Sequence, residues 1–328
     1  MAPDADAGKA SGNRSDPFAP LTTQLLPVGD GHEIYVETVG RTDGIPAVYL
    51  HGGPGSGCQP DHRRLFDPER FHAVLFDQRG AGRSSPKGRR EDNTLAHLIA
   101  DMEKIREKFD FERWMIVGGS WGATLALAYA QAHPDRVSGI VLRATFLGTR
   151  DELEGAFLDA LPRFYPDLSG DFLSLLPKNE REQPLDAYWR RILDSDPAVH
   201  GPAARAWHDT ERILSEHSSG RARLDLNALS ATGALPSTPF MEAHYFQNGC
   251  FMEPGQLLAE AGKLATIPGI VVQGRYDLLC PPAISHALAA VWPSEIRFVE
   301  GAGHSLFDRG VRDAVMKAIA DLASRITA

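Results

Sequence analysis

Short apolar runs, each followed by a glycine-rich loop, alternate in this chain with stretches of helical periodicity. The clearest runs lie at residues 46–50, 72–76 and 114–117, and the apolar side chains between Leu95 and Ile105 fall at helical spacing. Further strands are expected at residues 33–38, 137–142, 269–273 and 296–299, and further helices at 123–132 and 311–323. Strands that alternate with helices in this way predict βαβ units and a mostly parallel, twisted sheet with helices on both faces. We therefore expect an α/β fold.

One long region interrupts this alternation. Residues 148–250 contain helical stretches rich in charges, aromatic residues and prolines, and no buried parallel strand is visible there. We expect a helical cap domain at 148–250, inserted into a core formed by residues 21–147 and 251–328. Such an insertion could lie over the carboxyl ends of the strands, where open α/β sheets bind ligands. Residues 1–20 contain no apolar run, so we expect a flexible N-terminal tail rather than a signal peptide.

Composition excludes several classes of function. The formal charge of -9 has the wrong sign for a protein that neutralises phosphates, so nucleic acids and anionic membranes are poor partners. The cysteines are Cys58, Cys250 and Cys280, odd in number and without metal-binding spacing. We therefore expect a reducing compartment and no structural zinc, and we expect no cofactor.

A candidate nucleophile lies between an expected strand and an expected helix. The sequence GGSWG at residues 118–122 matches G-x-S-x-G, and this context is that of a nucleophile elbow, which presents Ser120 above the edge of the sheet. Glycines permit the sharp turn. A glycine-rich turn without a catalytic role is the alternative.

An elbow serine needs donors for the oxyanion that forms when it attacks a carbonyl. The loop HGGPG, which follows the strand at 46–50, can direct a backbone N–H into the site, and we favour Gly53 over Gly52 as the donor. Trp121, the residue after the nucleophile, would supply the second N–H.

The serine also needs an acid and a histidine from later in the chain. Asp277 follows the strand at 269–273, and His304 follows the strand at 296–299. His244 lies inside the insertion and His286 on an expected helix, so both fit less well than His304. The alternatives are that Asp277 only forms a turn and that His304 is a structural loop histidine. Together the residues predict acyl transfer, with Ser120 as nucleophile, His304 as base and Asp277 as its partner.

Longer stretches resemble a known family. HGGPGSG, DQRGAGRS, GGSWGATLALAYAQAHP, AYWRRILDSDPAV, GRYDLLCPP and GAGHS together resemble the proline iminopeptidase (prolyl aminopeptidase) family of α/β-hydrolases, from about residue 22 to residue 323. The resemblance implies the α/β-hydrolase fold and a cytoplasmic, metal-independent serine peptidase that removes N-terminal proline. It also implies that a helical cap closes the site and holds the free amine of the substrate.

The resemblance assigns site residues by position. It implies catalytic roles for Ser120, Asp277 and His304, amine binding by Glu211 and Glu242, and an apolar proline pocket at Phe146 and Phe246. Without the family, Glu211 reads as a solvated charge on a helix, and the two phenylalanines read as core residues.

The chain departs from the family pattern at the substrate end, with Ala144, Thr145, Thr210 and Ala243. A specialised amidase, esterase or cyclase on the same triad, or a non-catalytic binding protein, are therefore alternatives to an aminopeptidase. The expected partner is a small peptide or amide with a free N-terminal amine, bound by a monomer or a small homo-oligomer.

Overall fold

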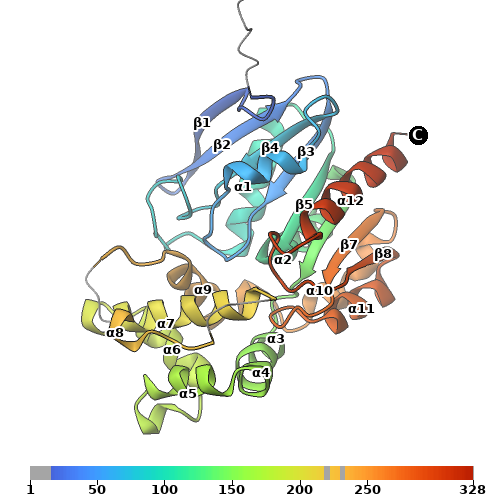
Figure 1. The fold of residues 1–328 in the computed structure, drawn as a ribbon. Coiled ribbons are helices and arrows are strands. Elements are labelled where there is room, and N and C mark those ends of the chain that lie inside the picture. The colour runs from blue at the N-terminus through green and yellow to red at the C-terminus, as the bar shows by residue number, and fades with distance from the viewer. Residues whose placement is uncertain (1–15, 218–221, 230–232, 328) are drawn as a thin grey trace, which may run out of the picture.

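A computed structural model describes residues 16–217, 222–229 and 233–327 of the chain (Figure 1). Eight strands form one sheet in the order β1-β2-β4-β3-β5-β6-β7-β8. Their bounds are Thr22–Gly29 (β1), His32–Gly40 (β2), Ile45–Leu50 (β3), Phe71–Phe76 (β4), Trp114–Ser120 (β5), Val137–Thr145 (β6), Gly269–Gly274 (β7) and Ser294–Val299 (β8). β1 and β2, and β2 and β4, pair antiparallel, whereas all the other neighbours are parallel. The predicted mostly parallel sheet is confirmed.

Different helices cover the two faces of the sheet. The bounds of the core helices are Leu95–Lys108 (α1), Trp121–Ala132 (α2), Pro282–Val291 (α11) and Val311–Ile326 (α12). α1, α2 and α11 bury apolar side chains in a cluster on one face, and α12 buries its side chains in a second cluster on the other. Residues such as Val48 and Val74 point to the first cluster, and Ala47 and Ala73 to the second, as alternation along a strand requires.

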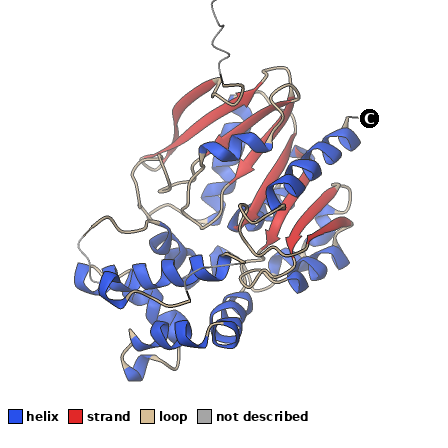
Figure 2. Cartoon of the chain, in the orientation of Figure 1, coloured by secondary structure: helices blue, strands red, loops and turns tan. Residues whose placement is uncertain are grey.

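The chain between β6 and β7 is helical and forms a lobe beside the carboxyl ends of the strands (Figures 1 and 2). Its helices are Arg150–Glu154 (α3), Leu161–Phe164 (α4), Pro166–Ser174 (α5), Pro184–Ile192 (α6), Pro197–Ser215 (α7), Leu226–Leu229 (α8), Thr238–Gln247 (α9) and Gln256–Ala259 (α10). We call α3 to α9 the cap. Its limits at residues 148 and 250 stay a prediction.

Prolines begin several cap helices instead of breaking them. α5, α6 and α7 each start with proline, which suits the first turn of a helix because the missing N–H would have no partner there. The side chain of Asp196 caps α7 by accepting a hydrogen bond from the N–H of Ala198. Stacked aromatic rings then join the helices, with Phe172 4.0 Å from Tyr188 and Phe157 4.5 Å from Trp207 between ring centroids. The cap therefore has an apolar interior of its own.

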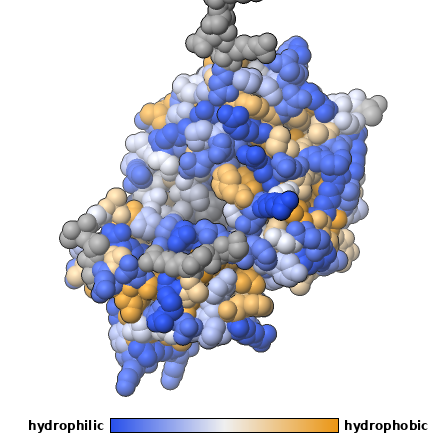
Figure 3. Space-filling model, in the orientation of Figure 1, coloured by the Kyte–Doolittle hydropathy of each residue, from blue (hydrophilic) through white to orange (hydrophobic). Residues whose placement is uncertain are grey.

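The surface carries mostly hydrophilic side chains on the face shown in Figure 3, with hydrophobic ones in smaller patches between them. Within the described ranges, no helix combines the length and the apolar character needed to cross a membrane. The predicted tail at residues 1–20 lies largely outside the described residues. Its last part is described: the Arg64 guanidinium carbon lies 4.9 Å from the centroid of the Phe18 ring.

Candidate active site

Ser120 ends β5 and precedes α2 in a strained backbone conformation. Its φ is 56° and its ψ is −125°, a region that residues with side chains rarely adopt. The backbone packs so closely at the neighbouring glycines that neither position has room for a side chain. A Cβ on Gly118 would lie 2.3 Å from the carbonyl oxygen of Gly122, and a Cβ on Gly122 would lie 2.2 Å from the carbonyl oxygen of Leu50. Helix α2 therefore starts directly against the end of β3, and the turn lifts Ser120 out of the sheet.

Asp277 and His304 lie in the loops after β7 and β8 and are hydrogen-bonded. The Nδ1 atom of His304 is 3.1 Å from Oδ1 and 3.0 Å from Oδ2 of Asp277. Both residues are buried. The backbone N–H groups of Leu279 and Cys280 also donate to Oδ1 of Asp277, so the carboxyl group is held in one orientation. This arrangement leaves Nε2 as the imidazole nitrogen free to act on a substrate or a nucleophile.

A cavity of about 340 Å³ brings the predicted residues together. Ser120 and His304 line it from the core, and Glu211 and Glu242 line it from α7 and α9 of the cap. The side chains of Ser120 and His304 share the cavity without a direct hydrogen bond between them. Catalytic hydrogen bonds are often long in the absence of substrate and shorten on binding.

The loop after β3 also reaches this cavity. Gly52 and Gly53 both line it, and a Cβ on Gly52 would lie 3.6 Å from Cβ of Ser120. Gly53 has a φ of +106°, and a Cβ on it would lie 2.7 Å from the backbone nitrogen of Gly55. This position therefore requires glycine. Both candidate donors lie at the site, so the preference for Gly53 stays a prediction.

Gln78, which the sequence analysis missed, ties this loop to the elbow. Its backbone N–H donates to Nε2 of His51 (3.0 Å), its side-chain amide donates to the carbonyl oxygen of His51 (3.0 Å), and it accepts a hydrogen bond from Nε1 of Trp121 (2.9 Å). Burial lowers the pKa of His51, which favours the neutral ring that this acceptor role needs. Gln78 belongs to the DQRG sequence, which the sequence analysis could have singled out. Its hydrogen-bond partners, His51 and Trp121, are distant in the chain, so no local pattern shows the contact.

Glu211 and Glu242 form a hydrogen-bonded pair of carboxyl groups at the cap side of the cavity. Nε1 of Trp207 donates to Oε2 of Glu242 over 2.7 Å. Burial raises the pKa of both groups, and the negative charge of Glu211 raises the pKa of Glu242 further. Of the two carboxyl groups, Glu242 is therefore the one that more readily holds a proton. Glu211 is half-buried and lines the cavity.

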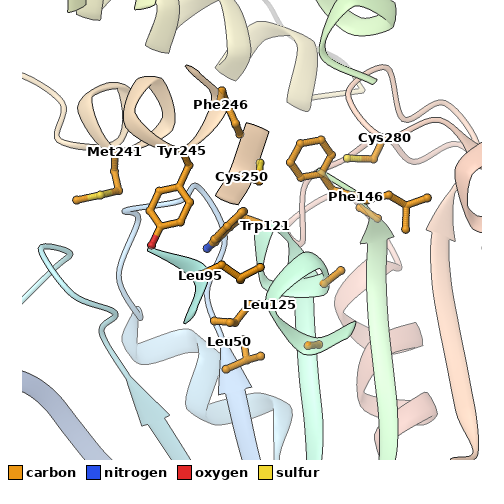
Figure 4. Close-up of a cluster of buried hydrophobic side chains, with 14 of the residues drawn as sticks. Leu50, Leu95, Trp121, Leu125, Phe146, Met241, Tyr245, Phe246, Cys250 and Cys280 are labelled. Atoms are coloured by element: carbon orange, nitrogen blue, oxygen red, sulfur yellow. The ribbon is translucent and has the colours of Figure 1, made fainter. Parts of the chain in front are cut away.

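A small apolar cavity of about 30 Å³ adjoins Ser120. Phe146, which follows β6, and Phe246 of α9 line it together with Ala156 and Cys280. The two phenylalanine rings meet edge to face, with centroids 5.9 Å apart (Figure 4). Both are buried in the core, as a reading without the family predicted, and both also reach the cavity. Ala156 gave no signal in the sequence.

A larger cavity of about 910 Å³ lies elsewhere, between α3 and α4 of the cap and the loop that carries Asp277. Asp277 and Glu152 line it, but neither Ser120 nor His304 does. We therefore place the candidate site in the smaller cavities. The described part of the chain contains no cluster of three or more histidine, cysteine, aspartate or glutamate residues that could hold a metal ion.

The departures from the family pattern lie around the site but outside its cavities, and Thr145 pairs with Ser120 across the sheet. None of Ala144, Thr145, Thr210 and Ala243 is among the described residues that line the cavities next to Ser120. Thr145 instead accepts a hydrogen bond from Ser285 (2.9 Å), and Thr210 and Ala243 are packed inside the cap.

Comparison with known proteins supports the same reading. The family model described as alpha/beta hydrolase fold matches residues 46–311. A protein named proline iminopeptidase from Arabidopsis thaliana is 42% identical over 300 residues, which are 90% of this chain and 78% of that protein. A probable proline iminopeptidase from Leptolyngbya boryana is 40% identical over 307 residues, which are 92% of this chain and 94% of that protein.

Among solved structures, proline iminopeptidase from Mycobacterium smegmatis matches with a TM-score of 0.58 and 18% identity, over 93% of this chain and 99% of that one. At this identity the likeness concerns the fold alone. The sequence relatives cover about nine tenths of the chain, and the family model covers the cap and the core from residue 46 to residue 311. The chain therefore belongs to the proline iminopeptidase family of α/β-hydrolases.

Proposed function

We propose that the protein is a serine hydrolase that releases N-terminal proline from peptides through an acyl-enzyme. The observation that carries the proposal is the shared cavity. Ser120 in its strained conformation, His304, Glu211 and Glu242 all line it, and His304 is hydrogen-bonded to Asp277 behind it. The names of the relatives point to the same activity.

The proposed reaction follows from these positions. Oγ of Ser120 attacks the carbonyl carbon of the N-terminal residue while Nε2 of His304 accepts the hydroxyl proton. Backbone N–H groups of Gly53 and Trp121 hold the oxyanion. His304 then returns the proton to the leaving amine, the C–N bond breaks, and water hydrolyses the ester on Ser120 by the same route. Asp277 orients the imidazole and stabilises its charged form.

The cap supplies the preference for an N-terminal residue. A prolyl substrate carries a secondary ammonium, and we assign its binding to Glu211, because Glu242 is the carboxyl group that more readily holds a proton. We assign the pyrrolidine ring to the small cavity at Phe146 and Phe246, where aromatic faces favour packing beside a cation. Because the departures from the family pattern lie outside these cavities, they give no support to an altered substrate.

We also propose a cytoplasmic location and activity as a monomer or a small homo-oligomer. Three free cysteines, all of them buried, suit a reducing compartment. A single chain supplies every residue of the proposed site, so catalysis needs no partner subunit. Cell fractionation and size-exclusion chromatography with light scattering test the two statements.

Four chromogenic substrates test the proposed function. Wild type and Ser120→Ala are compared on the p-nitroanilides of proline, alanine and N-acetylproline, and on p-nitrophenyl acetate. We expect kcat/KM for the prolyl amide to exceed that for the alanyl amide by at least about 10-fold, and the N-acetylated amide to be a poor substrate. Ser120→Ala should lower kcat by about 10³-fold or more and should lose labelling by a fluorophosphonate.

Full activity in Ser120→Ala contradicts the proposed mechanism. Preference for the acetate ester or for the N-acetylated amide contradicts the aminopeptidase assignment and favours an esterase or amidase. If the wild type shows neither labelling nor turnover, the protein is a binding protein and not an enzyme.

A further inference from the structure

The end of helix α7 contacts the loop that carries His304. Ser215 is the last residue of α7, and its carbonyl oxygen accepts hydrogen bonds from the backbone N–H groups of His304 and Ser305, both over 3.1 Å. The loop thus uses a free carbonyl at a helix end, where the last turn has no intrahelical donors. The imidazole of the proposed base is therefore attached through its own backbone to the cap.

The next residues of the chain contact the loop that carries Asp277. The ring of His217 stacks on that of Tyr276, with centroids 5.1 Å apart and planes 26° apart. The backbone of His217 also lies against Gly303, because a Cβ on Gly303 would be 3.2 Å from the nitrogen of His217. The N–H of Tyr276 donates to the carbonyl oxygen of Ala302 (2.9 Å), which joins the two catalytic loops. We call residues 215–217 the strap.

The strap continues directly from the part of α7 that lines the proposed amine site. Glu211 lies one helical turn before Ser215, so both face the same side of the helix and both line the cavity with Ser120. Earlier in α7, Trp207 is fixed in the cap by its hydrogen bond to Glu242 and by its stacking on Phe157. A helix held in this way moves as a unit, so the positions of Glu211 and Ser215 are coupled.

We propose that the strap sets the position of His304 and Asp277 relative to Glu211, and that His217 and Tyr276 are positioning residues for catalysis. The proposal rests on the proposed roles of His304, Asp277 and Glu211. Since Ser120 and His304 share the cavity without a hydrogen bond, productive alignment depends on small displacements of the His304 loop. The strap controls these displacements from the cap. Loss of its contacts therefore slows the chemical step and leaves amine binding almost intact.

Single substitutions in the stacked pair test the proposal. His217→Ala and Tyr276→Ala should each lower kcat by about 3- to 10-fold, the rate equivalent of one aromatic contact, on both the prolyl amide and p-nitrophenyl acetate. KM for the prolyl amide should change by less than about 2-fold, because Glu211 keeps its place. His217→Phe and Tyr276→Phe keep the stacked rings and should restore kcat to within about 2-fold of wild type.

A matched control separates this effect from the loss of any exposed aromatic contact. His286 of α11 stacks on Phe298, with centroids 5.7 Å apart and planes 30° apart, and does not line the cavity. His286→Ala should leave kcat unchanged.

The strap proposal is overturned if His217→Ala and Tyr276→Ala keep wild-type kcat, if they raise KM alone, if the phenylalanine variants fail to restore kcat, or if His286→Ala loses as much as His217→Ala. These outcomes differ from failure of the proposed function, which would appear as activity retained in Ser120→Ala and His304→Ala. Thermal unfolding midpoints of all variants are measured in parallel, and the phenylalanine variants decide any case in which an alanine variant is unstable.

Discussion

Two carboxyl groups side by side in a buried cavity have a clear chemical meaning. Glu242 is 1% exposed and contacts Trp207 and Glu211, so a second negative charge there would be costly. A cationic amine brought into the cavity removes that cost by pairing with Glu211. The same pair repels a neutral or acylated N-terminus only weakly. Its contribution therefore appears as tighter binding of substrates with a free amine.

Replacement of Glu211 tests this role. Glu211→Gln should raise KM for the prolyl amide by about 10- to 100-fold, the value of one hydrogen bond to a charged group, and should change turnover of p-nitrophenyl acetate little. Steady-state kinetics on both substrates measure it. Asp209→Asn removes a charge from the same helix at a position that does not line the cavity, and should leave both substrates unaffected. Equal losses on the amide and the ester would show that Glu211 is not the amine site.

Sequence reasoning could not assign Glu211 from its own surroundings. A glutamate on a charged helix resembles any solvated residue, and its partner Glu242 comes from another helix. Only the family resemblance pointed to it. Asp277 and His304 were different, because chain order and late-strand loops limit the candidates to a few positions. Gln78 and the strap were missed since their contacts join the cap or the elbow to distant loops, and no local pattern encodes them.

At the level of elements, the strand–turn–helix unit around Ser120 depends on glycines, because the close contacts there leave no room for a Cβ atom. Gly122→Ala would place a methyl 2.2 Å from the carbonyl oxygen of Leu50, on the neighbouring strand β3. Since backbone must move to admit it, we expect the free energy of unfolding to fall by about 1–3 kcal/mol or more, with loss of activity. Urea unfolding measures the change.

Gly170→Ala is the matched control for this substitution. Gly170 is exposed inside α5, and a Cβ there meets nothing within 4 Å. The change should raise the free energy of unfolding by about 0.5–1 kcal/mol, because alanine favours the helix. If Gly122→Ala proves as stable as Gly170→Ala, the elbow is not the close contact described here.

Burial made some elements easier to predict than others. β4 is buried along its whole length and gave a continuous apolar run, whereas β1 lies at the edge of the sheet, is mostly exposed and was missed. β5 and β6 extend beyond their apolar runs because Gly119 and Ser120 pair with Arg143 and Thr145 across a bulge. Backbone pairing determines where β5 and β6 end, and it leaves no pattern of side chains in the sequence.

For the whole molecule, the buried carboxyl pair makes stability depend on pH. The pKa of Glu242 is raised in the folded protein above its ordinary value of about 4.3. At a pH between the ordinary pKa and the raised pKa, Glu242 holds a proton in the folded chain and has lost it in the unfolded chain. Stability conferred by the neutral group is therefore present at low pH and decreases as pH rises above about 4.3, by at most about 1.4 kcal/mol per pH unit.

Glu242→Gln removes this dependence while its amide oxygen can still accept the hydrogen bond from Trp207. We expect the thermal midpoint of the variant, relative to wild type, to rise as pH increases above about 4.3 and to level off above the raised pKa of Glu242. Glu260→Gln, which alters a carboxylate in an exposed pair with Lys263, should show no such trend. Parallel pH profiles for Glu242→Gln and wild type would mean that the pair carries no buried proton.

The cap interrupts the core between β6 and β7, so the proposed nucleophile and its proposed base lie on opposite sides of the insertion in the order of synthesis. A ribosome makes Ser120 first and reaches His304 only after the whole cap has emerged. At about 5–20 residues per second this delay lasts roughly ten to forty seconds. During that time the nascent chain carries a serine that has no base to activate it. The polypeptides crowded around the ribosome are therefore not exposed to an unguarded nucleophile, and hydrolytic competence arrives only with the last part of the chain.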